Sequence, residues 1–256
     1  MTLHPVRVLR ATRALWRRDR SLLLPIAGLF LFVPQWAILL LVPEAPPFEG
    51  GANEQASAAW SQALSAWVAT NGLAYILAAL AGQFGTLAIA SLYMGPGAGQ
   101  VGSALRRAAM TFGRYLLSAL IVWAPMIAGA TLLVSVGGPA LAVGLAPVLY
   151  IAALALLTLV APSVAAGPGS AAHAVARAWR ASRGSRGALL ALAAMTMVAS
   201  QLGAMVLLAL AHSLRSGAGD NPIVLAMVYA GASMVLASGA LVLALAGPII
   251  YRALAK

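Results

Sequence analysis

The chain has 256 residues, of which 62% are apolar and only 8% are Asp, Glu, Lys or Arg. Soluble domains carry about 25% charged residues, so this chain lacks the polar surface to cover a water-soluble core, and its composition requires lipid as solvent. The net charge of +11 does not indicate nucleic-acid binding, because the Arg residues lie in short segments flanking apolar runs, which is a pattern of membrane topology.

Six stretches meet the requirement of about 20 mostly apolar residues for a membrane-spanning helix. They cover about 21–42, 70–94, 115–136, 140–161, 188–212 and 223–247. Gly137-Gly138-Pro139 predicts a tight turn between the third and the fourth. We therefore predict an all-α polytopic membrane protein, with residues 1–256 forming a single integral membrane domain.

The positive residues fall on alternate sides of this six-span arrangement. Six precede the first span, three lie between the second and third, four between the fourth and fifth, and two follow the sixth, whereas the other side carries only Arg215. Because positive residues resist translocation, both termini are predicted to be cytoplasmic. The use of Arg in place of Lys, together with abundant Ala and Gly, suggests a GC-rich bacterial genome, and hence the bacterial inner membrane.

Three of the basic segments, around residues 6–17, 101–114 and 175–186, show apolar residues at helical spacing beside Arg. This pattern is typical of amphipathic helices that lie in the headgroup layer. Each segment precedes two spans, and Arg13-Ala14 matches Arg107-Ala108 at an offset of 94 residues. The chain thus suggests a threefold repeat of an interfacial helix and two spans. The alternative is that any hairpin of this orientation favours Arg before its first span.

These segments supply the candidate lipid-binding residues. Each basic residue near an anionic leaflet contributes about 1 kcal/mol, so the Arg side chains could hold phospholipid headgroups; the alternative is simple topological anchoring. The candidates are Arg13, Arg17, Arg20, Arg106, Arg107, Arg114, Arg177, Arg180 and Arg183.

Within the predicted spans the sequence has no Asp, Glu, Lys or Arg, which disfavours proton- or cation-coupled transport. The intramembrane polar candidates are Gln35, Gln83 and Gln201. If the protein handles a polar ligand, these three should face one cavity; otherwise they form hydrogen bonds between helices, worth about 0.6–2 kcal/mol each. Prolines also interrupt the spans and predict kinks: Pro25, Pro34, Pro125 and Pro147.

Residues for catalysis or metal binding are scarce. The chain has no Cys, and its three histidines, His4, His173 and His212, lie on different segments. Asp19 lies among Arg residues and is predicted to pair with one of them. We therefore expect no catalytic residue, no metal site, no cofactor and no enzymatic activity.

The segment from Ala174 to Gly184, which follows Pro162 at a span end, resembles a recurring stretch in bacterial proteins with a glycerophosphoryl diester phosphodiesterase membrane domain. Trp16-Arg17-Arg18-Asp19-Arg20, leading into Leu22-Leu23-Leu24-Pro25, is similar as well, and the six-span layout agrees over the whole chain. Some relatives carry a fused catalytic domain, and many have an acidic residue where this chain has Ala166-Gly167. The resemblance implies a fold, and no catalytic residue is transferred with it.

Our leading hypothesis is a non-catalytic inner-membrane protein that engages anionic phospholipid or a membrane partner. The alternative is a transporter or facilitator of a small neutral or lipidic solute. A protein partner or a homo-oligomer stays open at this stage.

Overall fold

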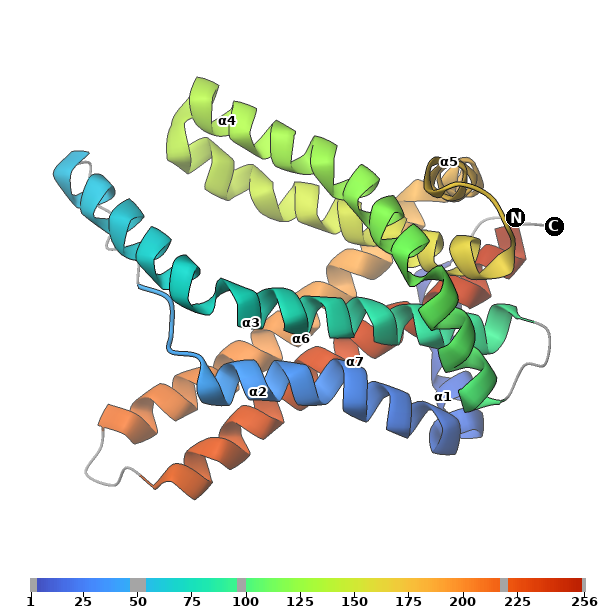
Figure 1. Ribbon diagram of the computed structural model, residues 1–256, viewed down its shortest axis with the longest axis horizontal. Helices are drawn as coiled ribbons and strands as arrows, with labels where there is room; N and C mark the ends of the chain where they lie inside the picture. The colour runs from blue at the N-terminus through green and yellow to red at the C-terminus, as the bar shows by residue number, and fades with distance from the viewer. Residues whose placement is uncertain (1–3, 47–53, 96–99, 217–220, 255–256) are drawn as a thin grey trace.

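The computed structural model describes residues 4–46, 54–95, 100–216 and 221–254, and within these ranges its regular elements are all helices (Figure 1). They are α1 (Pro5–Ala27), the π-helical turn η1 (Gly28–Phe32), α2 (Val33–Leu41), α3 (Glu54–Met94), α4 (Val101–Ala166), α5 (Ala171–Ser182), α6 (Arg186–Ser216) and α7 (Pro222–Leu254). Six stretches of the described chain are long and apolar enough to cross a membrane: Pro5–Leu41, Ala58–Met94, Val101–Leu133, Gly144–Ala166, Arg186–Arg215 and Pro222–Leu254. The predicted all-α class and the six potential spans are confirmed.

The spans form three helical hairpins: α1–α2 with α3, the two arms of α4, and α6 with α7 (Figure 1). The fold-back of α4 is clear from Trp123 and Tyr150, whose ring centroids lie 5.4 Å apart, whereas a straight helix would separate them by about 40 Å. Both chain ends and α5 lie at one end of the molecule (Figure 1). We call this the basic end; it consists of the starts of α1 and α4, the whole of α5 and the last turn of α7.

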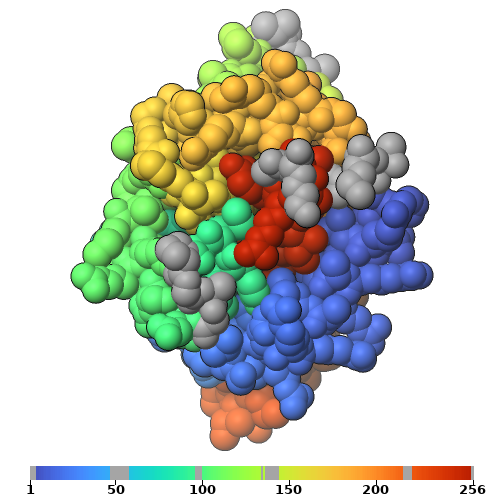
Figure 2. All heavy atoms as spheres, turned by 90° about the vertical axis from the view of Figure 1, so that its right-hand side faces the viewer, coloured from blue at the N-terminus to red at the C-terminus, as the bar shows by residue number. Residues whose placement is uncertain are grey.

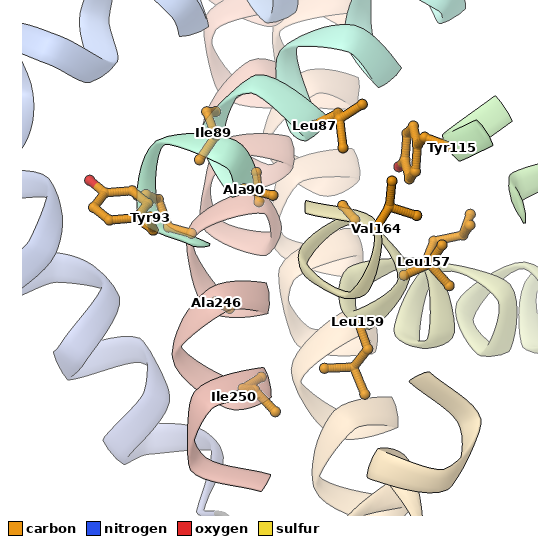
Figure 3. Close-up of a cluster of buried hydrophobic side chains, with 14 of the residues drawn as sticks. Leu87, Ile89, Ala90, Tyr93, Tyr115, Leu157, Leu159, Val164, Ala246 and Ile250 are labelled. Carbon is orange, nitrogen blue, oxygen red and sulfur yellow. The ribbon is translucent and has the colours of Figure 1, made fainter. Parts of the chain in front are cut away.

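Helix α7 lies at the centre of the bundle and contacts every other helical element. Seen from the basic end, its last turns are surrounded by α1, α3 and α5 (Figure 2). The buried core joins α3, α4 and α7 in the half of the bundle nearest this end (Figure 3), and includes Leu87, Ile89, Ala90, Tyr93, Tyr115, Leu157, Leu159, Val164, Ala246 and Ile250.

Small residues allow close approach between the spans, as they commonly do in membranes. A Cβ added at Gly239 would lie 2.8 Å from the Ser200 side chain of α6, and one added at Gly85 would lie 2.7 Å from the Cβ of Phe30. At Gly247, an added Cβ would collide with the Thr158 carbonyl oxygen of α4. The bundle is therefore held at distances that larger residues would not permit.

The first span is irregular, as its two prolines predict. Asp19 breaks the helical geometry of α1 with φ −111° and ψ 18°, and the π-helical turn η1 lies between Pro25 and Pro34. A π-helical turn inserts one residue into the helix, which rotates the following residues by about 100° relative to a regular α-helix. In contrast, α4 stays helical through Pro125 and Pro147.

The helices extend beyond the predicted spans. Helix α3 begins at Glu54, and its indoles tie back to the preceding connection: Trp60 Nε1 donates to the Pro46 carbonyl at 3.1 Å and Trp67 Nε1 to the Pro43 carbonyl at 3.0 Å. Of the three basic segments, only 171–182 forms a separate helix. The first joins its span through the kink at Asp19 and the second continues directly into its span, so their placement in a headgroup layer stays a prediction.

Candidate functional site

Two of the nine candidate Arg residues cap the end of α4. Arg114 donates from Nη1 to the Gly169 carbonyl at 3.1 Å, and from Nη2 to the carbonyls of Gly167, at 3.0 Å, and Val164. Arg177 Nη2, from α5, donates to the Ser163 carbonyl at 2.8 Å. The last carbonyls of a helix have no intrahelical partner and carry partial negative charge, so a guanidinium group there satisfies them and stabilises the helix end.

The end of α3 has a similar arrangement. Arg252, near the end of α7, donates from Nη2 to the Tyr93 carbonyl. Arg107 lies against Gly95, where an added Cβ would collide with its guanidinium group, and its Nε donates to the Ser103 carbonyl at 3.3 Å. Arg107, Arg114 and Arg177 thus have local structural contacts that the sequence pattern alone did not reveal.

The six other candidates are exposed: Arg13, Arg17, Arg20, Arg106, Arg180 and Arg183. Arg180 Nε makes one contact within its own helix, to the Ala176 carbonyl at 3.4 Å. Of the six, Arg13 alone lines one of the larger cavities found among the described residues, and this property separates it from the others.

That cavity is an apolar groove of about 510 Å³ between α1–η1 and α7, which we call the α1–α7 groove. Arg13 and Trp16 lie at its basic end. Its wall is otherwise almost wholly apolar and comprises Leu9, Thr12, Leu24, Ala27, Gly28, Phe32, Met234, Ala237, Ser238, Leu241, Val242 and Leu245. A second hollow of about 530 Å³ lies on the other side of Met234 and Ser238, against α6, and shares Leu9 and Val242 with the groove.

Thr12 is the polar feature of the α1–α7 groove. Its side chain is 4% exposed, and its hydroxyl oxygen has no hydrogen-bond partner within the described chain. A buried hydroxyl without a partner costs about 1–3 kcal/mol. The groove therefore combines an almost wholly apolar wall with an exposed guanidinium group, whereas the Thr12 hydroxyl oxygen is buried.

A smaller cavity of about 160 Å³ lies between α4 and α6, below Trp179. The Arg186 guanidinium lies 4.3 Å from the Trp179 ring centroid, within cation–π range. Arg186 was not among the predicted site residues; Trp179 belongs to α5 and Arg186 begins α6, so their contact depends on the turn between the two helices. An Arg and a Trp thus line an apolar cavity at two places in the structure.

The polar Gln candidates divide between a cavity and the outer surface. Gln35 and Gln83 line one cavity of about 370 Å³ between η1–α2, α3, α4 and α7, which we call the central cavity. Gln201 is exposed on α6 and does not line it. The expectation that all three face one cavity is therefore wrong for Gln201, because the surface of α6 that carries this residue faces away from the bundle.

The central cavity contains a buried hydrogen bond. Tyr115 is 1% exposed, and its hydroxyl donates to Gln83 Oε1 at 2.7 Å. Tyr115 was not among the predicted site residues, because tyrosines are common at span ends and no neighbouring residue in the sequence distinguishes this one. The insertion of one residue in η1 turns Gln35 relative to a regular helix and so contributes to its place on the cavity wall.

Asp19 forms the predicted ion pair. Arg18 donates to both of its carboxylate oxygens at 2.9 and 2.8 Å, and Tyr93 Oη of α3 donates to Oδ2 at 2.9 Å. The carboxylate at the kink of α1 is thereby connected to the end of α3. The hydrogen bonds of Asp19 therefore link the first span to the second.

These features define a class: a multi-pass helical membrane protein with arginine-capped helix ends, a lateral apolar groove and an uncharged central cavity. No protein-family model matches the chain, and comparisons with curated proteins and with solved structures find no match. Its resemblance to the phosphodiesterase membrane-domain family stays a prediction.

Proposed function

We propose that the protein is a non-catalytic membrane protein that binds an anionic phospholipid in the α1–α7 groove. The observation that carries this proposal is the composition of the groove: an almost wholly apolar wall, with the Trp16 indole and the exposed Arg13 guanidinium group in its lining. A phospholipid likewise combines apolar acyl chains with an anionic phosphate.

Each part of such a lipid meets a suitable group. The acyl chain lies against Leu24, Phe32 and Leu241, and the phosphate binds the Arg13 guanidinium. The adjoining hollow against α6 has room for a second chain. Its volume of about 530 Å³ is close to that of the groove itself, which favours a lipid with two chains.

The proposal also places the basic end on the cytoplasmic side of a bacterial inner membrane. Its support is the gathering of the Arg-bearing segments at one end of the bundle, whereas the last turn of α6, which contains Arg215, lies at the opposite end (Figure 1). Arg215 pairs with Glu44 at 3.0 Å. Lys256 belongs to the same basic set by sequence and lies outside the described residues. An anionic cytoplasmic leaflet attracts such a surface.

A second candidate function is favoured by one observation. Gln35 and Gln83 both line the central cavity within the spans, which fits a facilitator of a small neutral or lipidic solute. The third Gln contributes nothing to this candidate, since Gln201 lies on the outer surface.

Native mass spectrometry of protein released from membranes with its bound lipids tests the leading proposal. Arg13→Gln is expected to reduce retention of phosphatidylglycerol roughly fivefold, corresponding to about 1 kcal/mol for one basic contact. Gly28→Leu should abolish retention, because an added Cβ meets nothing within 4 Å and the longer side chain fills the groove.

Two matched variants control for charge and bulk. Arg106→Gln removes an exposed Arg outside the groove, and Gly102→Leu adds bulk at another glycine with open space around it. Both should retain phosphatidylglycerol as the unaltered protein does. Equal loss in Arg13→Gln and Arg106→Gln, or full retention in Gly28→Leu, would exclude the groove as the lipid site.

A further inference from the structure

The walls of the central cavity combine polar groups with a complete lack of charge. Among the described residues, its lining contains no Asp, Glu, Lys, Arg or His, although it lies between four elements of the bundle. Its polar residues are Gln35, Tyr75, Gln83, Thr86, Tyr115, Tyr150 and Thr158. A volume of about 370 Å³ lies within the range of about 300–1,000 Å³ that ligand pockets occupy.

Part of this hydrogen-bonding capacity is unused. Within the described residues, the Gln35 amide and Gln83 Nε2 have no hydrogen-bond partner, whereas Thr86 and Thr158 donate to carbonyls of their own helices at 3.0 and 2.8 Å. Leaving an amide unpaired in an apolar layer costs free energy that a hydrogen-bonding occupant would recover. The cavity is therefore suited to an occupant that forms hydrogen bonds.

The Tyr115–Gln83 hydrogen bond decides which groups are offered. Because the Tyr115 proton is committed to Gln83 Oε1, the Tyr115 oxygen can only accept a further bond, and the neighbouring Gln83 Nε2 can only donate. A ligand hydroxyl group can accept a hydrogen bond from Gln83 Nε2 and donate one to the Tyr115 oxygen. A ketone or an ether has no proton to donate and can bind only Gln83 Nε2. The pair thus favours an alcohol.

Aromatic side chains suit the carbon skeleton of such a ligand. Phe30, Tyr75 and Tyr150 line the cavity, and Tyr150 is held by ring contact with Trp123 at 5.4 Å. Aromatic faces cover C–H groups while amides and hydroxyls bind the oxygens. A charged ligand would lose its hydration in the spans and meet no counter-charge here, so the occupant is uncharged.

We propose that the central cavity binds an uncharged ligand bearing several hydroxyl groups, in which one hydroxyl bridges Gln83 and Tyr115. The ligand is either a free polyol or the headgroup of a neutral monoacyl lipid, which share this chemistry. This inference deepens the second candidate function, and its prediction of polyol transport rests on that function. Ligand binding in the central cavity does not depend on phospholipid in the α1–α7 groove.

The test uses the full chain in nanodiscs of zwitterionic phosphatidylcholine, with monooleoylglycerol as the lipid probe, and proteoliposomes with xylitol as the soluble probe. Retention of monooleoylglycerol is measured by native mass spectrometry, and xylitol equilibration by light scattering. Gln83→Leu should weaken the response about tenfold, which corresponds to about 1.4 kcal/mol for one uncharged hydrogen bond.

Tyr115→Phe removes the same bridge with little change in shape, and so keeps the test informative if Gln83→Leu folds poorly. Gln201→Leu makes the same chemical change on the exposed surface of α6 and should have no effect. Gly28→Leu fills the α1–α7 groove and should also leave monooleoylglycerol retention and xylitol equilibration unaltered. Failure of the phospholipid proposal is therefore measured separately from failure of this one.

The two probes distinguish the sources. Monooleoylglycerol retention that depends on Gln83 and Tyr115 supports the site with a lipid ligand, and xylitol equilibration with the same dependence supports it with a free polyol. If only retention shows this dependence, the binding site stands and the facilitator function fails. If neither response differs between the unaltered protein, Gln83→Leu and Tyr115→Phe, the proposal is overturned.

Discussion

Replacing Arg114 by Met tests whether this residue caps a helix or holds a lipid headgroup. The substitution keeps an apolar stem and removes the guanidinium group that reaches three backbone carbonyls at the end of α4. Arg106→Met is the matched control, because Arg106 lies in the same basic segment and is exposed.

The expected loss follows from the hydrogen bonds. A hydrogen bond to a charged group contributes about 1.5–3 kcal/mol, but the three share one side chain, and the partly exposed carbonyls can rebind water. Removal of Arg114 also relieves repulsion from the nearby Arg177. We therefore expect a net loss of about 2–4 kcal/mol in the free energy of unfolding, a substantial part of the 5–15 kcal/mol typical of a domain.

The assay is equilibrium unfolding in lipid-free detergent, followed by helical circular dichroism. Arg114→Met should unfold at clearly lower denaturant concentration than the unaltered protein, and Arg106→Met at nearly the same concentration. If Arg114 instead served only as a headgroup ligand, its removal would lower phosphatidylglycerol retention and leave unfolding in detergent unchanged. That result would refute the capping argument.

Two further predictions concern packing and the kink of α1. Gly247→Ala should destabilise the protein by about 1–3 kcal/mol, because the added Cβ would collide with the Thr158 carbonyl oxygen. Gly113→Ala places its Cβ in open space and should stabilise the protein by about 0.4–1 kcal/mol. Thermal unfolding in detergent distinguishes the two outcomes. Tyr93→Phe removes the hydrogen bond to the Asp19 carboxylate and should cost about 1.5–3 kcal/mol in the same assay, and an unchanged unfolding midpoint would show that the link between α1 and α3 contributes nothing.

Hydropathy and charge were sufficient to predict the helical class and the number of spans. Both depend on local composition: about 20 apolar residues suffice for a span whatever its neighbours are. The ion pair of Asp19 was also predictable, because its partner Arg18 is adjacent in sequence.

The roles of individual polar residues were not predictable in this way. Arg13 and Arg114 occupy equivalent kinds of segment, yet Arg13 lies exposed in the lining of a groove and Arg114 binds carbonyls at the end of the other arm of α4, at least 50 residues away in sequence. Which carbonyls or cavities an Arg reaches depends on which helix end lies beside it, and the segment's own composition contains no information about that.

The three Gln residues show the same division. All three lie in apolar spans by sequence, but tertiary structure places Gln35 and Gln83 on one cavity and Gln201 on the outer surface. The sequence by itself determined that the chain folds as six membrane-length helices with its positive charge at one end of them. Only the tertiary structure decided which side chains come together. This depends on which helices are neighbours and on how each helix is rotated about its axis, a rotation that the π-helical turn alters in the first span. Hydropathy contains no information about either property, because it does not depend on the direction of a side chain.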